Sequence, residues 1–170
     1  MSNLYFKEIK KNSYLLLNIN DDDSMSKINI FGNNLYSPFG IEDYKNKYIL
    51  NLEITKKKDI EFWEDIEKLD NFLRNINGFK IDDKIINLKN LEYYPILKKR
   101  KSKKPIIRTH IKITRNKINT AIKDTKNNEL TIFEFPKKTK IDVNLEIGDL
   151  WIYKNSYGIN IYCKNIYMKL

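Results

Sequence analysis

The chain has 170 residues, of which 41% are hydrophobic and 32% charged, and its formal net charge is +10. This length predicts a single globular domain over residues 1–170, and 5 Gly and 4 Pro exclude collagen-like and wholly disordered chains. No apolar run approaches the roughly 20 residues of a membrane helix, so we expect no membrane association. The single Cys163 cannot form an internal disulfide, which predicts a reducing, cytoplasmic location.

The first part of the chain alternates short apolar runs with turns. A solvated turn is expected at Asp21–Ser24, because adjacent carboxylates on an extended chain point to opposite faces and do not converge on a metal. A loop is expected at Pro38–Gly40. The predicted strands are Asn3–Lys10, Tyr14–Asn20, Lys27–Phe31 and Tyr48–Thr55.

One amphipathic helix is predicted at Asp59–Asn77. Asp59 is expected to cap its start and Gly78 to close its end. The other face is acidic and includes Asp70, so we expect the helix to pack on the core, away from any polyanion. The apolar positions recur at steps of three and four residues: Ile60, Trp63, Ile66, Leu69, Phe72, Leu73 and Ile76.

After Gly78 the apolar period becomes alternating, which is typical of strands. Leu97–Lys104 is expected to be a mobile loop. Asn155–Gly158 is expected to be the turn of a terminal hairpin. The predicted strands are Ile107–Ile113, Ile118–Ile122, Glu129–Phe135, Ile141–Leu145, Leu150–Lys154 and Ile159–Tyr167. The predicted fold class is therefore mostly β (α+β), a small closed or partly open β-barrel with one long packed amphipathic helix.

The whole positive surplus lies in Tyr93–Lys123, which holds eleven basic residues and no acidic one. The rest of the chain has 32 − 11 = 21 basic and 22 acidic residues, a net charge of −1. A basic block without interleaved acids indicates a surface that binds a polyanion. Two alternatives stay open: the codon bias of an AT-rich genome, or a localisation-type cluster at Lys98–Lys104.

Aromatic residues accompany this basic block. If Leu150 and Ile152 face the core, Trp151 and Tyr153 face outward, and Tyr162 and Lys164 do so on the partner strand. Cations track phosphates, while exposed rings stack bases at about 1–3 kcal/mol each. The predicted nucleic-acid-binding residues are Lys98, Lys99, Arg100, Lys101, Lys103 and Lys104 as a phosphate clamp, Arg108, His110, Lys112, Arg115 and Lys117 as a groove floor, Trp151, Tyr153 and Tyr162 as stacking rings, and Tyr94, Tyr157 and Lys164 beside them.

Motifs for catalysis and cofactor binding are missing. The chain has no Gly-Lys dipeptide for a phosphate-cradling loop and no Gly-x-Gly for a dinucleotide. One His and one Cys cannot form a structural zinc site, and Cys163 shares its alternation with Ile159 and Ile161, which predicts a buried thiol. We therefore expect no enzymatic activity, no metal and no cofactor.

The C-terminal third carries a recognisable order of motifs: Leu150-Trp151, then Tyr157-Gly158, then a strand at Ile159–Ile166. This order resembles the closing segment of an OB-fold single-stranded DNA-binding protein family of large cytoplasmic DNA viruses and yeast linear cytoplasmic plasmids. Residues 37–52 resemble the family's Pro-Phe-Gly-then-strand element, so the resemblance covers elements from about residue 37 to 167. It implies an OB-fold and a role in protecting displaced strands during replication in the host cytoplasm, with replication proteins as partners.

The predicted function is non-catalytic, sequence-nonspecific binding of single-stranded DNA in DNA replication. The helix is acidic, whereas a duplex reader would present a basic helix to the major groove. RNA is an alternative ligand, because the same stacking and phosphate contacts serve single-stranded RNA. A structural or protein-interaction subunit of a viral or plasmid replication or transcription complex is the other alternative. The sequence leaves the oligomeric state open.

Overall fold

The computed structural model describes residues 4–57 and 59–169, so Asn3, the first residue of the first predicted strand, lies outside them. Its single helix in these ranges is α1 (Ile60–Asn75). The strands are β1 (Leu4–Lys10), β2 (Ser13–Ile19), β3 (Met25–Lys27), β4 (Asn29–Ser37), β5 (Ile41–Tyr44), β6 (Lys47–Glu53), β7 (Gly78–Ile81), β8 (Lys84–Asn87), β9 (Glu92–Tyr93), β10 (Leu97–Arg100), β11 (Lys103–Ile111), β12 (Ile113–Thr114), β13 (Lys117–Ile118), β14 (Ala121–Lys123), β15 (Thr139–Tyr153) and β16 (Ser156–Met168).

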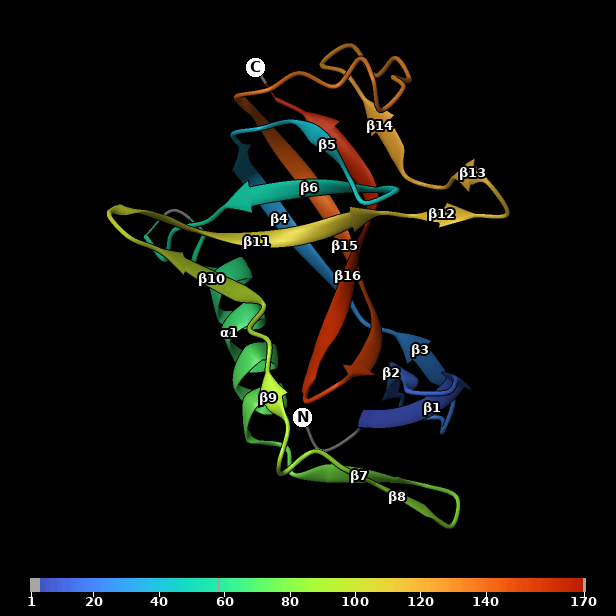
Figure 1. Ribbon diagram of the computed structural model, residues 1–170. Helices are drawn as coiled ribbons and strands as arrows, with labels where there is room; N and C mark the ends of the chain where they lie inside the picture. Colours follow the sequence, from blue (N-terminus) through green and yellow to red (C-terminus); the bar gives the residue numbers. More distant parts are fainter. Residues whose placement is uncertain (1–3, 58, 170) are drawn as a thin grey trace.

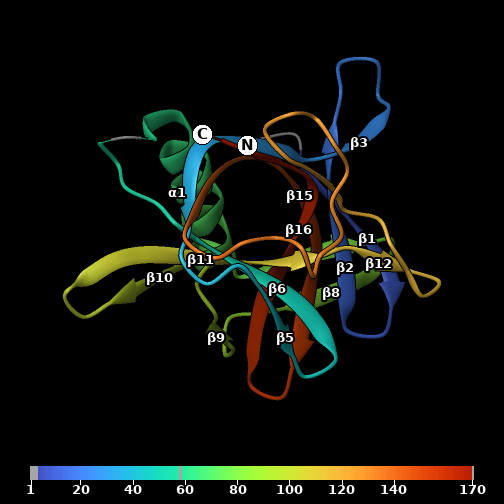
Figure 2. The same ribbon diagram turned by 90° about the horizontal axis from the view of Figure 1, so that it is seen from above.

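A closed ring of strands forms the centre of the molecule, and Figure 2 looks into it from above. β15 pairs with β4, β4 with β6, β6 with β11, β11 with β16, and β16 returns to β15. All of these pairings are antiparallel except β11–β16, which is parallel. The predicted OB-like β-barrel with one packed helix is therefore confirmed.

The β15–β16 hairpin is longer than the barrel and extends below it (Figure 1). Its pairing shifts register between Asn144 and Leu145 and again between Ile147 and Leu150. Such bulges bend a strand, and they let one hairpin serve first the barrel and then a second layer. Beyond the second bulge, Asp149, Leu150 and Trp151 pair with β2, which brings the β1–β2 hairpin beside the lower half of β15.

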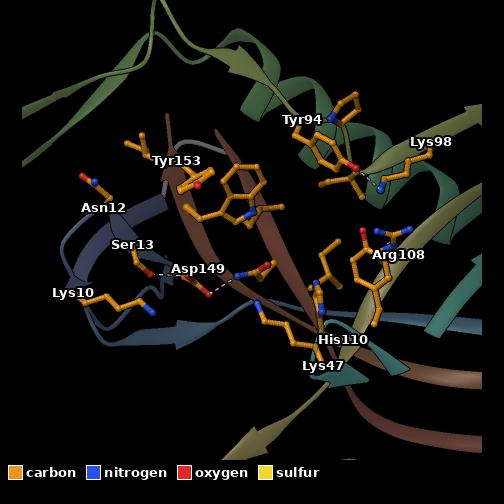
Figure 3. Close-up of a pocket in the computed structure, with 18 of the residues that line it drawn as sticks. Lys10, Asn12, Ser13, Lys47, Tyr94, Lys98, Arg108, His110, Asp149 and Tyr153 are labelled. Atoms are coloured by element: carbon orange, nitrogen blue, oxygen red, sulfur yellow. Dashed lines mark hydrogen bonds between the residues drawn. The ribbon is translucent and has the colours of Figure 1, made fainter. Parts of the chain in front are cut away.

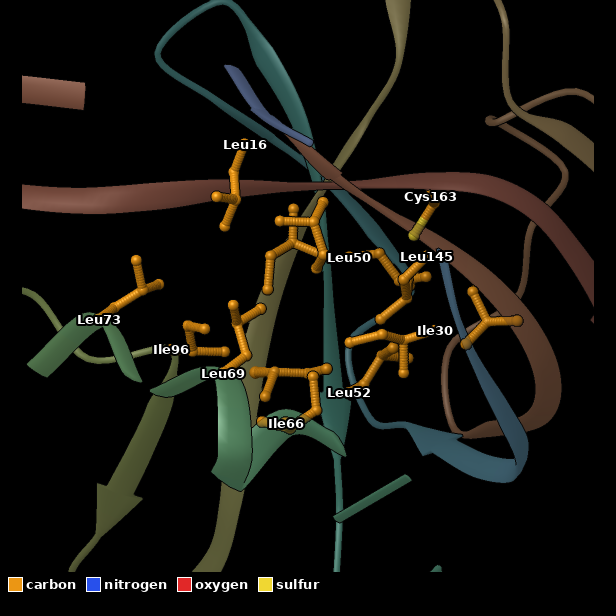
Figure 4. Close-up of a cluster of buried hydrophobic side chains, with 14 of the residues drawn as sticks. Leu16, Ile30, Leu50, Leu52, Ile66, Leu69, Leu73, Ile96, Leu145 and Cys163 are labelled. Atoms are coloured by element: carbon orange, nitrogen blue, oxygen red, sulfur yellow. The ribbon is translucent and has the colours of Figure 1, made fainter. Parts of the chain in front are cut away.

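The core fills the barrel and continues under α1 (Figure 4). Leu50, Leu52 and Leu145 of the barrel strands are fully buried, and Ile66 and Leu73 of the helix are buried with them. Within the described residues, no helix has both the length and the apolar character needed to cross a bilayer.

The helix starts as predicted, with Asp59 as its N-cap residue, although the Asp59 carboxylate accepts from the N–H of Thr55 at 3.5 Å and not from the first turn. Ile60, expected on the apolar face, is 55% exposed, and the face turned to the core includes Phe62 instead. The helix is shorter than predicted at its C-terminal end. It ends at Asn75, because the chain is already extended at Ile76. Gly78 does not close the helix. It belongs to β7, where a Cβ would collide with the backbone carbonyl of Ile86 across the hairpin.

The expected mobile loop at Leu97–Lys104 is wrong. These residues form the β10–β11 hairpin, in which Leu97 pairs with Ile107 and Arg100 with Lys103. Ser102 supplies the positive φ, 56°, that the tight turn requires. An ion pair between Arg100 and Glu53 of β6, at 2.7 Å, holds the hairpin against the barrel despite its density of lysines.

The expected strand at Glu129–Phe135 is also wrong, because only an isolated bridge at Glu129 forms. The carboxylate of Glu134 accepts hydrogen bonds from both the N–H and the hydroxyl of Thr131, each at 2.8 Å, and these bonds fold the chain into a turn. Ile113 and Ile118, expected on the apolar face, are 42% and 43% exposed, since they lie in a small β12–β13 hairpin that projects from the barrel (Figure 1).

Candidate nucleic-acid interface

An open groove of about 590 Å³ lies between β11 and the half of the β15–β16 hairpin that ends in its turn, and Figure 3 shows the residues that line it. Its walls come from five places in the sequence: the β1–β2 turn, the β5–β6 hairpin, the segment that joins β9 to β10, β11 and the β15–β16 hairpin. Its floor is apolar where Ile159 and Ile161 reach it and polar at Asp149 and Asn160.

Aromatic rings line the groove from three of these elements. Trp151 and Tyr153 come from β15, Tyr94 from the β9–β10 connection and Tyr44 from β5. Tyr153 is 67% exposed and Tyr94 50% exposed, and a lysine Nζ lies over each ring, that of Lys154 at 5.4 Å and that of Lys98 at 4.5 Å from the centroid. The ring centroids of Tyr94 and Trp151 lie 6.0 Å apart, inclined by 54°.

Gly158 creates the seat for the Trp151 indole. The two residues are cross-strand partners in the β15–β16 hairpin. A Cβ at residue 158 would lie 2.6 Å from Cζ2 of Trp151 and 3.2 Å from Cβ of Tyr94, so only glycine lets the indole lie across the backbone here. Tyr94 is held alongside, because its N–H donates to the carbonyl of Tyr157 at 2.8 Å. The Trp-then-Gly order of the sequence therefore has a direct steric cause.

Five cationic side chains surround these rings: Lys10, Lys11, Lys47, Lys98 and Arg108. Lys98 Nζ donates to the Tyr94 hydroxyl at 2.7 Å, and this bond lowers the pKa of Tyr94. The guanidinium of Arg108 lies 5.0 Å from the ring centroid of Tyr44. Its Nε is shielded from solvent and has no hydrogen-bond partner within the described residues.

His110 adds no charge to the groove. Burial, together with the positive charges of Lys47 and Arg108, lowers the pKa of His110 to about 4. The imidazole is therefore neutral at pH 7, and its ring centroid lies 6.0 Å from that of Tyr162. Its contribution is a flat, uncharged surface.

Asp149 is the one carboxylate among the described residues that line the groove. It accepts hydrogen bonds from the Ser13 hydroxyl at 2.6 Å, from Asn160 Nδ2 at 3.1 Å and from the Tyr162 hydroxyl at 3.3 Å. Burial alone would raise the pKa of Asp149, but these hydrogen bonds hold the pKa below its ordinary value. The carboxylate thus stays ionised and fastens Ser13, with the Lys10–Lys11 turn, to the groove.

Asp70 supports the groove from behind. It was expected on the exposed acidic face of α1, but it is 7% exposed. Its carboxylate accepts from the N–H of Ile96 at 2.7 Å and from the Tyr93 hydroxyl at 2.9 Å. Burial raises the pKa of Tyr93, so its hydroxyl keeps the proton that it donates. The segment that carries Tyr94 is therefore tied to the helix on both sides of that residue.

Six of the predicted site residues meet in the groove. They are Tyr94, Lys98, Arg108, His110, Trp151 and Tyr153. Tyr162 is half-buried and does not line the groove; burial raises its pKa to about 12 and its hydroxyl donates to Asp149.

The other predicted cations lie elsewhere. Arg100 pairs with Glu53, and Lys112 with Glu146 at 2.6 Å. Lys104 borders a separate hollow that Glu53 also lines. The remaining residues are exposed outside the groove lining: Lys99, Lys101 and Lys103 on the β10–β11 hairpin, Arg115 and Lys117 at the β12–β13 turn, and Lys164 on β16.

Tyr157 is not at the hairpin tip. The turn consists of Lys154 and Asn155, and Tyr157 lies within β16 with 2% of its surface exposed. Its hydroxyl donates to the carbonyl of Leu73 at 2.7 Å, which satisfies a carbonyl in the last turn of α1. A ring in this position cannot stack on a base.

Tyr157→Phe is expected to lower the free energy of unfolding by about 1–2 kcal/mol, because the Leu73 carbonyl loses its donor in a buried site. Urea denaturation measures this effect. If Tyr157 were instead an exposed stacking ring, phenylalanine would serve equally well and stability would not change. Tyr153→Phe, at 67% exposure, is the matched control and should leave stability unaltered.

Four further residues line the groove but were not predicted from the sequence: Lys10, Lys11, Lys47 and Tyr44. These residues lie outside the basic block, in turns of a region whose overall charge is balanced. A usable signal existed in the Tyr44–Tyr48 turn, where two lysines stand between tyrosines. The β5–β6 pairing places Tyr44 opposite Lys47, and both reach the groove.

Cys163 is buried, as predicted. Its Sγ lies 3.0 Å from the Thr109 hydroxyl, and burial raises the pKa of the thiol to about 12. The thiol is therefore protonated at neutral pH and shielded from any substrate. Among residues 4–57 and 59–169, no three His, Cys, Asp or Glu side chains gather in a way that could hold a metal ion.

No protein-family model matches the chain, and no curated protein matches its sequence. Solved structures of the single-stranded DNA-binding protein from bacteriophage Enc34 resemble it in fold. A C-terminally truncated form has a TM-score of 0.54 at 12% identity, covering 99% of this chain and 95% of that one. The same phage protein in complex with single-stranded DNA has a TM-score of 0.53 at 15% identity, covering 99% and 96%. A further structure of it has a TM-score of 0.50 at 14% identity, covering 97% and 88%. At these identities the likeness shows the fold.

Proposed function

We propose that the chain is a non-catalytic protein that binds single-stranded DNA without sequence preference, with the strand held in the groove. The observation that carries this proposal is the gathering of four aromatic rings and five cations, from five separate segments, in one open groove. Rings stack only on bases that are not already stacked within a duplex, and cations along the same groove follow the phosphates. The phage protein of similar fold that was solved with single-stranded DNA supports this choice of ligand.

The roles divide by position. Trp151, Tyr153 and Tyr94 stack bases, while Lys47, Lys98 and Arg108 contact phosphates. Exposed Lys99, Lys101 and Lys103 extend the positive field along the β10–β11 hairpin and draw the strand toward the groove. The biological setting that fits this activity is the protection of displaced strands during replication of a viral or plasmid genome in the host cytoplasm, together with replication proteins.

Salt titration tests the proposal. If about five phosphates are neutralised, the logarithm of the affinity for oligo-dT should fall with log salt at a slope of roughly −3.5. Fluorescence anisotropy measures the slope, with matched RNA and duplex DNA in parallel. Preferred binding of RNA would replace the proposed ligand, and a flat response would refute the phosphate contacts.

Single charge removals locate the contacts. Lys47→Gln and Lys98→Gln should each make the slope less steep by about 0.7. Lys104→Gln removes the same charge from an exposed lysine outside the groove, and it should leave the slope unchanged. An equal loss from all three variants would show that general charge, rather than the groove, governs binding.

A further inference from the structure

An exposed ring lies on the outer face of the barrel, outside the groove. Phe31 is the third residue of β4, and 63% of its surface is exposed. A single exposed apolar residue is ordinary in a folded protein. Two further features indicate a function for Phe31: the residues beside its ring and the position of this face relative to the groove.

The neighbours of Phe31 leave its ring open. The strand register places Asn144 of β15 beside it, then Asn165 of β16, then Ala121 of β14. We call these four residues the Phe31 row. Two amides and an alanine offer polar edges and little bulk beside the ring. Oδ1 of Asn144 is shielded from solvent and has no hydrogen-bond partner among the described residues, so an acceptor in this row lacks a donor.

The Phe31 row continues the surface of the groove. In the next row along the same strands, Glu146 of β15 pairs with Tyr162 of β16, and Tyr162 pairs with His110 of β11. His110 lines the groove. From Trp151 to Asn144 the path follows one strand, β15, for roughly 20 Å at about 3.3 Å per residue. A single strand of DNA that leaves the groove past His110 therefore crosses β16 and β15 to arrive at Phe31 on β4.

The charges on this face favour a polyanion. The Glu146 carboxylate is held by both Lys27 at 2.9 Å and Lys112 at 2.6 Å, so two cations share one anion. Asp142 is paired with Lys169 at 2.5 Å. Glu146 and Asp142 are thus paired with three lysines, which leaves a net positive charge of one on this group of side chains.

We propose that the single strand held by the groove continues over the outer face of β4, β15 and β16 and stacks a base on Phe31. This second stacking site rests on the proposed function of the groove. It predicts a longer binding site than the groove alone occupies, since the strand passes His110 and Tyr162 before it meets the ring.

The test is a length series of oligo-dT, from about 4 to 16 nucleotides, with the wild-type chain and Phe31→Ala. Short oligomers fill the groove only, so the variant should bind them as the wild type does. Longer oligomers reach Phe31, and the variant should bind them about 5- to 100-fold more weakly. Phe31→Tyr keeps the ring and should restore the affinity. Phe133→Ala is the matched control. Phe133 is 80% exposed and its ring packs edge-on against that of Tyr48, so its removal should leave the affinity unchanged at every oligomer length.

Each outcome decides the proposal. Equal affinities of wild type and Phe31→Ala at every length would overturn the second site and leave the groove untouched. Equal losses at every length would also overturn it, because the effect would then act through the groove or the fold. If the wild type binds no oligomer at all, the proposed function itself fails, and this inference fails with it. A thermal melt of each variant shows that the fold is retained.

Discussion

Asp70→Ala is expected to lower the free energy of unfolding by about 2–5 kcal/mol. The substitution leaves the N–H of Ile96 and the hydroxyl of Tyr93 without their acceptor in a site where water cannot replace it. Each unsatisfied buried donor costs about 1–3 kcal/mol. For a chain of this length, the melting temperature should fall by roughly 5–15 °C. Urea denaturation and thermal melts measure the two quantities.

Arg74→Gln is the control for this substitution. Arg74 forms an ion pair with Asp70 at 2.8 Å, but the Arg74 side chain is 50% exposed. The substitution therefore removes only an ion pair that solvent already screens. The expected cost is below about 1 kcal/mol. If Arg74→Gln proved as damaging as Asp70→Ala, the ion pair and not the tie to Tyr93 and Ile96 would be the stabilising interaction.

Folded Asp70→Asn should also bind oligo-dT more weakly, since the segment that carries Tyr94 loses part of its anchor.

Trp151→Ala is expected to weaken the binding of oligo-dT by about 1–3 kcal/mol, which is about 5- to 100-fold in affinity. The indole lies across Gly158 with its other face toward the groove, so its loss removes a stacking surface and leaves the barrel core unaltered. Fluorescence anisotropy measures the affinity, and circular dichroism establishes that the variant is folded.

Two control variants distinguish a stacking role of Trp151 from a structural one. Trp151→Phe keeps a ring at the same position and should retain most of the affinity. Trp63→Ala removes a tryptophan of α1 that is packed against the core and far from the groove lining, so it should reduce stability without reducing the affinity of the folded protein. Unfolding of Trp151→Ala would assign that residue to the core, and unchanged affinity would remove it from the interface.

The elements that were predicted correctly are those whose apolar period is long and regular. β11 alternates Ile107, Thr109 and Ile111 with Arg108 and His110, and the structure buries the first three and turns the other two to the groove. The hairpin at the C-terminus was predicted for the same reason. Where a local bond competes with the period, as at Thr131 and Glu134, the predicted strand does not form.

The structure gathers only part of the predicted site in one groove, because position in a basic block does not reveal the partner of each cation. Arg100 and Lys112 have the same sequence context as Lys98 and Arg108, but strands distant in sequence supply Glu53 and Glu146 to the first pair. Lys10 and Lys47 were overlooked, since their region has a balanced charge along the chain and only the fold separates its lysines from its acids.

The period of neighbouring residues predicted the fold class, the presence of the helix and the alternation that turns Arg108, His110, Trp151 and Tyr153 to one side of their strands, because each of these depends on residues close together in the chain. Contacts between distant segments select the cations that line the groove, bury Asp70 and Tyr157 as anchors, and bring five segments together in one groove. Those outcomes depend on pairings between residues far apart in the chain, which no local pattern encodes.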